Sequence, residues 1–297
     1  MAFKIIVCAK QVPDTNVIKI NPKTGTLIRD GVPSILNHDD NNALEEALKI
    51  KDKYDDVTVT VISMGPPQAT DLLFECIAKG ADEGILVSDR AVGGSDTWAT
   101  SNTLEAAIRK WEKENGPADL IFAGRQAIDG DTAQVGPQIA EKLDLPQVTY
   151  VEEIQEVKDG RIRVKRHIDG GVETVEAPLP IVLTVNGSAA PCRPRNAKLV
   201  QKYKRALGAQ EKAAITKDGT ALPYASLYES RPYLNITEWS VADVNGDTKQ
   251  CGLSGSPTKV KKIENIIFQA KESKTITGSD ADVENLIVEL LANHTIG

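Results

Sequence analysis

Short apolar runs alternate with amphipathic stretches through the first half of the chain, up to about residue 150. The apolar runs lack an in–out alternation of polar positions, which is typical of parallel strands covered on both faces. The predicted strands are residues 3–9, 57–62, 84–87 and 119–123. The predicted helices, with apolar residues at helical spacing, are residues 40–53, 68–79 and 96–114, and a further helix begins near Val135. This order predicts a parallel sheet with right-handed crossovers.

Two regions depart from this plan. Residues 17–33 are typical of a β-hairpin inserted after the first strand. Beyond residue 150, residues 161–167 and 171–176 alternate around a glycine-containing turn, and residues 180–185 form an apolar strand. We expect these three strands to add an antiparallel part to one edge of the sheet, which gives an α/β domain over residues 1–190.

Packing signals become sparse after residue 188. Residues 193–205 carry six Lys and Arg residues and no acidic residue, which indicates either a solvated surface or a docking surface for an acidic partner. Residues 206–279 contain no long periodic apolar segment, whereas residues 280–293 predict a final helix. We expect residues 191–225 to be a partner-recognition loop and linker, and residues 226–297 to be an arm wrapped around another polypeptide. The apolar and aromatic residues that favour wrapping over disorder are Leu222, Tyr224, Leu227, Tyr228, Tyr233, Leu234, Ile236 and Trp239.

The loop from Ala123 to Pro137 joins an apolar strand to a helix through small residues. A helix start offers free backbone N–H groups and a positive dipole end, which together suit a phosphate or pyrophosphate. Asp129 and Asp131 can cap the helix or accept hydrogen bonds from ribose hydroxyls. The local pattern alone fits a well-capped turn equally well.

Other loops at the same ends of the strands carry chemistry that suits a ligand. Cys8 and Ala9 follow the first strand, and Met64 and Gly65 follow the second, where small or soft side chains let a ring approach. After the third strand, hydroxyl side chains open the inward stripe of a helix: Thr97, Thr100 and Ser101, preceded by Asp96. Asn37 begins the first long helix and suits a ligand contact or a helix N-cap equally.

Composition excludes several function classes. The chain has 297 residues and a net charge of −7, which argues against nucleic acid as a partner. No apolar run is long enough to span a membrane and no leader pattern opens the chain, so we expect no membrane insertion and a cytoplasmic location. The four cysteines lie far apart and only three histidines are present, so we expect no metal site. We also find no nucleophile or acid–base pair, so no catalytic residue is assigned.

Several motifs, in their order and spacing, are specific together although each is weak alone. They are residues 7–14 (VCAKQVPD), 42–48 (NALEEAL), 78–82 (AKGAD), 124–131 (GRQAIDGD), 168–171 (IDGG) and 255–260 (GSPTKV). In these motifs the chain resembles the β subunits of electron transfer flavoproteins, the family that includes FixA proteins. The resemblance runs from Lys4 to the C-terminal helix. It implies a Rossmann-like, adenine-nucleotide alpha hydrolase-like fold, and an α subunit held by the C-terminal arm.

The family has two types, and the resemblance favours one of them. Housekeeping members hold AMP in the β subunit, whereas electron-bifurcating members hold FAD there and take a hydride from NADH. The segments 94–101 and 130–136 are similar to the FAD-holding type. The implied acceptors are ferredoxin or flavodoxin, and the α-subunit FAD followed by an FAD-dependent dehydrogenase. Binding of AMP by a non-bifurcating β subunit is the alternative, and a free-standing nucleotide-binding regulator is a second one.

The resemblance assigns a role to each candidate residue. Phosphate and ribose would be held by Asp129, Asp131, Thr132, Gln134, Val135 and Gly136, within a loop that also contributes Gly124, Arg125, Gln126, Gly130 and Ala133. The nucleotide would be lined by Cys8, Ala9, Asn37, Met64 and Gly65. The flavin would face Asp96, Thr97, Thr100 and Ser101, and Arg125 would place positive charge near an anionic form of the ring. Residues 186–195 depart from the family's partner-recognition stretch, so acyl-CoA, enoyl-CoA and lactate types of dehydrogenase all remain open.

Overall fold

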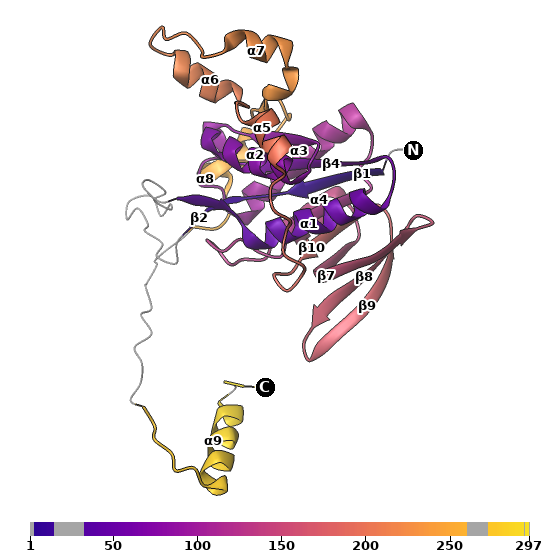
Figure 1. Ribbon diagram of the computed structural model, residues 1–297, viewed down its shortest axis with the longest axis vertical. Coiled ribbons are helices and arrows are strands. Elements are labelled where there is room, and N and C mark those ends of the chain that lie inside the picture. Colours follow the sequence, from indigo (N-terminus) through magenta and orange to yellow (C-terminus); the bar gives the residue numbers. More distant parts are fainter. Residues whose placement is uncertain (1–2, 15–32, 260–272, 294, 297) are drawn as a thin grey trace. The chain divides into compact units, whose positions relative to one another are not determined.

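The computed structural model describes residues 3–14, 33–259, 273–293 and 295–296. The predicted parallel strands are present as β1 (Phe3–Cys8), β4 (Val57–Met64), β5 (Glu83–Val87) and β6 (Leu120–Gly124). The remaining strands of the main sheet are β7 (Gln147–Lys158), β8 (Arg161–Ile168), β9 (Gly171–Pro178), β10 (Ile181–Val185) and β11 (Thr237–Trp239). Within the described residues the sheet has nine strands in the order β11-β5-β4-β1-β6-β10-β7-β8-β9 (Figure 1).

The order reverses at β1. The chain runs from β1 outward to β4 and β5 on one side, and then returns to place β6 and β10 on the other. The β1–β4, β4–β5, β1–β6 and β6–β10 pairs are all parallel. In open sheets of this kind, ligands bind outside the carboxyl ends of the strands where the order reverses. The topology therefore points to the ends of β1 and β6.

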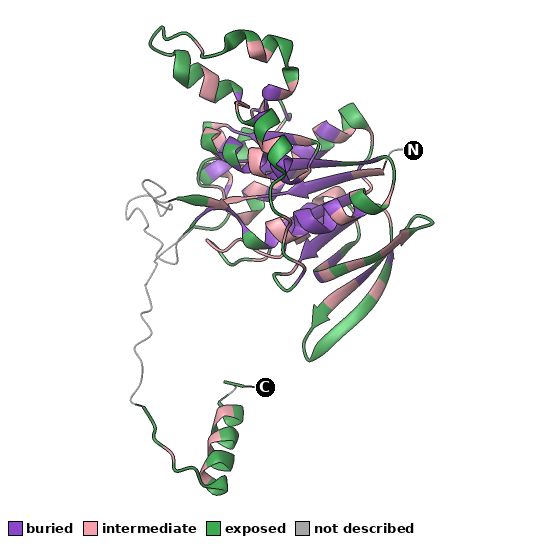
Figure 2. Cartoon of the chain, in the orientation of Figure 1, coloured by how far each residue is buried: buried purple, intermediate pink, exposed green. Residues whose placement is uncertain are grey.

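Two helical layers cover the sheet. The helices predicted from the sequence are present in the structure as α1 (His38–Lys53), α2 (Thr70–Lys79), α3 (Thr97–Asn115) and α4 (Val135–Leu143). Strand β1 divides its side chains between two cores: Ile5 and Val7 pack with α1 and α2, whereas Ile6 and Cys8 pack with α3 and α4. Figure 2 shows the strands buried between these layers. Burial on both faces explains why the strands are continuous apolar runs.

The edge beyond β6 differs in part from the sequence prediction. Strands β8 and β9 are antiparallel, as expected, but β10 pairs in parallel with both β6 and β7. All five residues of β10 are buried, so this strand belongs to the sheet interior rather than to an antiparallel edge. Strand β7 is absent from the sequence prediction, because its charged residues and two register irregularities interrupt the alternation that would indicate a strand.

The predicted hairpin over residues 17–33 lies outside the described residues, apart from residue 33. The segments on either side of it are described. Strand β2 (Gln11–Pro13) pairs antiparallel with β3 (Ser34–Leu36) in a separate small sheet. The chain therefore returns to the start of α1 close to the point where it left β1.

Residues after β10 pack more extensively on this chain than the sequence predicts. They form α5 (Ala197–Tyr203), α6 (Ala209–Thr216), α7 (Ala225–Ser230) and α8 (Gly252–Gly255). Leu234, Ile236 and Trp239 are buried, and β11 pairs with β5 at the edge of the sheet. The expectation that these three side chains need another polypeptide to cover them is wrong, because this chain buries all three, Ile236 and Trp239 within its two cores.

The chain divides into two compact units, residues 1–260 and 261–297. The first unit thus includes residues 226–260, which the sequence analysis assigns to the arm. The second unit contains the predicted final helix, α9 (Asp280–Ala292), and Ser279 is its N-cap residue. None of its residues is buried, and its apolar side chains Val283, Ile287, Val288 and Leu291 are all exposed. Among the described helices, none combines the length and apolar character needed to cross a membrane.

Candidate functional site

The candidate site consists of the carboxyl ends of β1, β4 and β6 with the first turns of α3 and α4, and is called here the carboxyl-edge site. A buried carboxylate lies at its base. The Oδ2 atom of Asp40 accepts the backbone N–H of Lys10 at 2.8 Å, and its Oδ1 atom accepts that of Gly124 at 2.9 Å. A Cβ atom on Gly124 would lie 2.4 Å from Asp40 Oδ1. Only glycine therefore allows this contact, through which α1 holds the ends of β1 and β6 together.

Burial changes the pKa values of the ionisable groups at the bottom of the site. Loss of hydration raises the pKa of Asp40 to about 7, against the opposing effect of its backbone hydrogen bonds and of Lys10. Burial, together with the nearby Asp40 charge, raises the pKa of Cys8 to about 12. Cys8 therefore stays a neutral thiol at physiological pH and fits the wall of a pocket rather than a nucleophile.

Asn37 shapes the loop after β6. It occupies the N-cap position of α1, but its side chain makes no capping hydrogen bond. Its amide instead donates to the Gln126 carbonyl at 2.8 Å, and its oxygen accepts the Ile128 N–H at 3.1 Å. Asn37 therefore lies at the N-cap position, but its side chain bonds to the loop after β6 instead of capping the helix.

The acidic residues of that loop already have protein partners. Asp129, whose side chain is 3% exposed, forms an ion pair with Lys10 at 2.6 Å. Asp131 accepts a hydrogen bond from Gln126 at 2.9 Å. Asp131 and Ala133 have left-handed backbone conformations, with φ of 50° and 52°. The loop is therefore held in a defined turn that delivers the chain to the start of α4.

The first turn of α4 presents backbone donors that have no partner among the described residues. Its N-cap residue Gln134 makes no capping side-chain hydrogen bond. Among the described residues, the N–H groups of Val135 and Gly136 have no hydrogen-bond acceptor. A Cβ atom on Gly136 would lie 2.5 Å from Thr184 Cγ2, so α4 approaches β10 as closely as glycine permits. Two free N–H groups on a positive helix end are suited to an anion.

The predicted hydroxyl stripe of α3 lies against α4. Thr97 donates to the Gln134 side chain at 2.8 Å, and Ser101 bonds to Gln138 at 3.1 Å. Thr100 is half-buried, and its hydroxyl has no hydrogen-bond partner among the described residues. Two of the three hydroxyls therefore join the helices, and the third makes no hydrogen bond to the described residues.

The remaining predicted residues complete the same edge of the sheet. Ala9 is buried at the end of β1 and donates its N–H to the Ile62 carbonyl. Met64 is the last residue of β4, and Gly65 follows it with little space for a side chain, because a Cβ atom would lie 3.0 Å from Ala69 Cβ. Gly130 and Thr132 are exposed. The structure thus brings all the predicted site residues to the carboxyl edge.

Arg125 and Asp96 have protein partners at this edge. The Arg125 guanidinium lies 3.4 Å from Asp39 and 5.5 Å from the centre of the Tyr150 ring. Asp96 caps α3 by accepting the Ala99 N–H at 2.9 Å, and it also bonds to Thr258.

Sequence reasoning missed several residues that build the site, among them Lys10, Asp40, Gln138 and Thr184. Lys10 and Asp129 are 119 residues apart and meet only in the fold. Asp40 has a weak signal in the sequence, since it is one of two acids in the first turn of a helix. Such acids are usually solvated, and only the topology shows that this one is buried between two strand ends.

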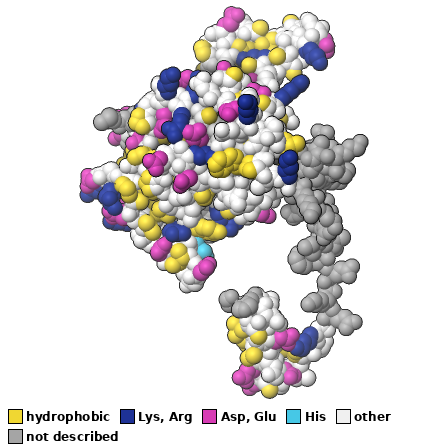
Figure 3. Space-filling view, turned by 180° about the vertical axis from the view of Figure 1, so that it is seen from behind, with side chains coloured by type: hydrophobic (Ala, Val, Ile, Leu, Met, Phe, Trp, Pro, Cys, Tyr) yellow, Lys and Arg dark blue, Asp and Glu magenta, His cyan; other side chains and the backbone are white. Residues whose placement is uncertain are grey.

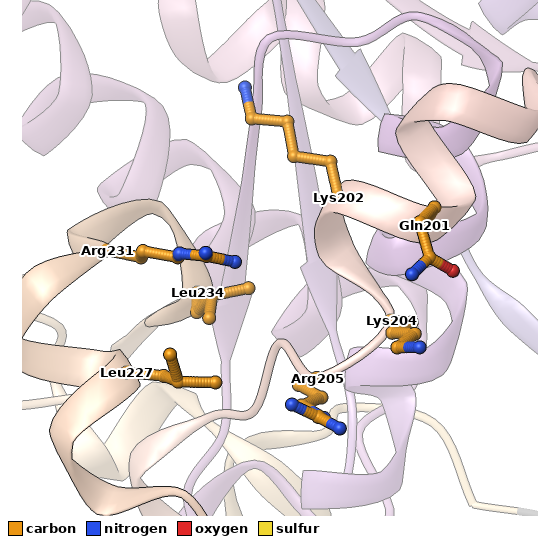
Figure 4. Close-up of a pocket in the computed structure, with 7 residues that line it drawn as sticks. All are labelled: Gln201, Lys202, Lys204, Arg205, Leu227, Arg231 and Leu234. Atoms are coloured by element: carbon orange, nitrogen blue, oxygen red, sulfur yellow. The ribbon is translucent and has the colours of Figure 1, made fainter.

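The basic run 193–205 divides into two parts. Arg193 is half-buried and forms ion pairs with Glu45 at 2.9 Å and Asp52 at 2.8 Å, so its charge is compensated within the chain. Further along, a hollow of about 270 Å³ separates α5 from α7 (Figure 4). It is lined by Gln201, Lys202, Lys204, Arg205, Leu227, Arg231 and Leu234. The docking interpretation of the run 193–205 stays a prediction, and Lys202, Lys204 and Arg205 of that run line this hollow.

Comparison with known proteins identifies the family. The family model for the electron transfer flavoprotein domain matches residues 24–217. The caffeyl-CoA reductase-Etf complex subunit CarD of Acetobacterium woodii is 49% identical over 258 residues, covering 87% of this chain and 86% of the relative. The chain belongs to the electron transfer flavoprotein β-subunit and FixA family. The resemblance stated from the sequence motifs is thereby confirmed.

Two further relatives of this family cover nearly the whole chain. Protein FixA of Azotobacter vinelandii is 41% identical over 290 residues, covering 97% of this chain and 92% of the relative. The acryloyl-CoA reductase electron transfer subunit gamma of Anaerotignum propionicum is 42% identical over 296 residues, covering 99% of this chain and 100% of the relative. The similarity to this family therefore includes the C-terminal unit.

The environment of Asp40 predicts a pH dependence of stability. A raised folded-state pKa means that the folded protein binds the proton more tightly than the unfolded chain, so Asp40 costs stability as the pH rises through about 7. Lowering the pH from 8 to 5 should raise the melting temperature of the wild type more than that of Asp40→Asn, because the asparagine side chain is uncharged at every pH. One pKa unit corresponds to about 1.4 kcal/mol. Asp55→Asn, at an exposed position, is the control. A constant difference between wild type and Asp40→Asn across this range would contradict the assignment.

The contact between α4 and β10 predicts a rescue experiment. Gly136→Ala should push α4 away from Thr184 and lower stability by about 1–3 kcal/mol. Thr184→Ser removes the Cγ2 atom that clashes, and the other two neighbours of that Cβ atom, at 3.5 and 3.8 Å, are at ordinary contact distance. The double variant should therefore recover the melting temperature and nucleotide retention, measured on the purified complex. Equal stability of Gly136→Ala and wild type would show that the close approach is unimportant.

Proposed function

We propose that the chain is the β subunit of an electron-bifurcating electron transfer flavoprotein, with FAD at the carboxyl-edge site. The observation that carries the proposal is the first turn of α4, where the N–H groups of Val135 and Gly136 lack an acceptor in the described chain. These donors suit the pyrophosphate of a dinucleotide, and Gly136 lets the helix backbone approach it.

The residues around the carboxyl edge fit the other parts of the cofactor. Phosphate and ribose would be held by Asp129, Asp131, Thr132, Gln134, Val135 and Gly136, and the nucleotide would be lined by Cys8, Ala9, Asn37, Met64 and Gly65. The buried neutral thiol of Cys8 suits an apolar wall. In this arrangement Lys10 neutralises Asp129, which lowers the repulsion between that carboxylate and a phosphate.

The flavin end would lie against Thr97, Thr100 and Ser101. Polar ring atoms need hydrogen-bond partners when they are buried, and the unpartnered hydroxyl of Thr100 can supply one. Arg125 would place positive charge near the ring, with its orientation fixed by Asp39 and Tyr150. The bound FAD would supply the hydride and single-electron chemistry that divides electrons from NADH between ferredoxin or flavodoxin and the FAD of the α subunit.

The proposed partners are the α subunit and an FAD-dependent dehydrogenase. The exposed apolar side chains of α9 support a bound α subunit, because a group of exposed apolar side chains marks a surface that another protein covers. The printed names of two relatives, a caffeyl-CoA reductase complex subunit and an acryloyl-CoA reductase electron transfer subunit, favour a CoA-linked dehydrogenase.

AMP binding is the second candidate for this site. The same α4 donors would hold a single phosphate, and the surrounding residues would line the adenosine. Only the α3 hydroxyls distinguish the two candidates, because AMP would leave Thr100 without a partner.

Nucleotide content tests the proposal. The complex with its α subunit is purified and denatured, and the released nucleotides are separated by chromatography. We expect two FAD molecules for each αβ pair. One FAD and one AMP would establish the non-bifurcating alternative.

The substitution Thr100→Val tests whether the flavin end of the cofactor depends on α3. The substitution keeps the shape of the side chain and removes the hydroxyl. Loss of one hydrogen bond should weaken the affinity for FAD about fivefold. Less FAD should remain at the β site, while AMP binding and the melting temperature of the nucleotide-free complex stay unchanged. Thr100→Ser should restore FAD retention, and an equal loss of FAD and AMP in Thr100→Val would place the hydroxyl elsewhere.

A further inference from the structure

Asp96 joins the first turn of α3 to a segment more than 150 residues later in the sequence. One carboxylate oxygen accepts the Ala99 N–H at 2.9 Å and so caps α3. The other accepts both the N–H of Thr258 at 2.9 Å and its hydroxyl at 2.6 Å. Burial opposes ionisation of this carboxyl, but the bonds from Ala99 and Thr258 together lower its pKa. A carboxylate that accepts several N–H and O–H donors makes stronger bonds than a neutral acceptor.

The same two segments meet at further points. The backbone N–H of Asp96 donates to the buried Ser256 hydroxyl at 2.8 Å, and that hydroxyl donates to the Gly252 carbonyl at 2.7 Å. The N–H of Gly252 in turn donates to Ser95 Oγ at 3.0 Å. A Cβ atom on Gly252 would lie 2.1 Å from the Ala91 carbonyl oxygen, so the two backbones are in direct contact. Residues 252–258 with Ser95 and Asp96 are called here the C-terminal latch.

The latch adjoins the site. Thr97, the residue after Asp96, bonds to Gln134 at the start of α4. We propose that Asp96 is a positioning residue, which through Thr258 and Ser256 fixes the α3 hydroxyls for the bound nucleotide and so couples nucleotide binding to the stability of the latch. Asp96 then acts through α3 rather than by touching the flavin itself.

Coupling of this kind is reciprocal. If the latch favours nucleotide binding, the bound nucleotide must stabilise the latch by the same factor. A merely local role for Thr258 in holding residues 252–258 predicts no such effect. This inference rests on the proposed function only for the identity of the nucleotide, since the latch would position α3 for FAD or for AMP.

Thr258→Val tests the coupling, because it removes the charged hydrogen bond and keeps the shape of the side chain. Thr258→Ser, which keeps the hydroxyl, is the matched control. Amide exchange of residues 95–101 and 252–258 is measured in the complex with its α subunit, with and without saturating FAD or AMP. The dissociation constant and the visible spectrum of the β-site nucleotide are recorded in parallel.

We expect Thr258→Val to speed exchange in both segments and to raise the dissociation constant about fivefold, with recovery in Thr258→Ser. In the wild type, nucleotide should slow exchange in residues 252–258. Faster exchange confined to residues 252–258, with unchanged nucleotide affinity, would overturn the proposal. A β site that takes only AMP would overturn the proposed function, while the exchange data would still decide the role of the latch.

Discussion

The carboxylate of Asp40 is the interaction on which the carboxyl-edge site depends. It bonds to one backbone N–H after β1 and to another at the end of β6, which are the two strands that meet where the sheet order reverses. Without a side chain on Gly124, α1 approaches closely enough for both bonds. If a shorter side chain replaced this group, both strand ends would lose a hydrogen-bond acceptor at a place that water reaches poorly. The shape of the loops above it follows from this anchor.

The ligand proposed for the site is polyanionic, whereas the chain has a net charge of −7. Cations are not the main attraction, because Lys10 is paired with Asp129 and Arg125 lies beside Asp39. On the face drawn in Figure 3, acidic and basic side chains are interspersed. The attraction must therefore be local and come from backbone donors at the start of α4, which cost no side-chain ordering when a ligand binds.

The sequence predicts the sheet well because its central strands are buried on both faces and its helices are amphipathic. It predicts β10 wrongly, since an apolar run cannot indicate whether a strand lies in the interior or at an edge. It also misplaces Leu234, Ile236 and Trp239, whose short segments have no period and are covered only through long-range packing. Within the site, motif spacing predicts which loops converge. It does not show that Asn37 bonds to the loop after β6 or that Asp96 is shared with Thr258, because these partners are 91 and 162 residues away.

The two ends of the proposed cofactor site form one mechanical unit. Thr97 and Ser101 on α3 bond to Gln134 and Gln138 on α4, so the starts of the two helices cannot move independently without losing these bonds. Helix α4 is held against β10 at Gly136, whereas the first turn of α3 is held by Asp96 and residues 252–258. A displacement of residues 252–258 therefore reaches α3 first and α4 only through the two glutamines. It follows that the hydroxyls of α3 are more sensitive to residues 252–258 than the N–H groups at the start of α4 are.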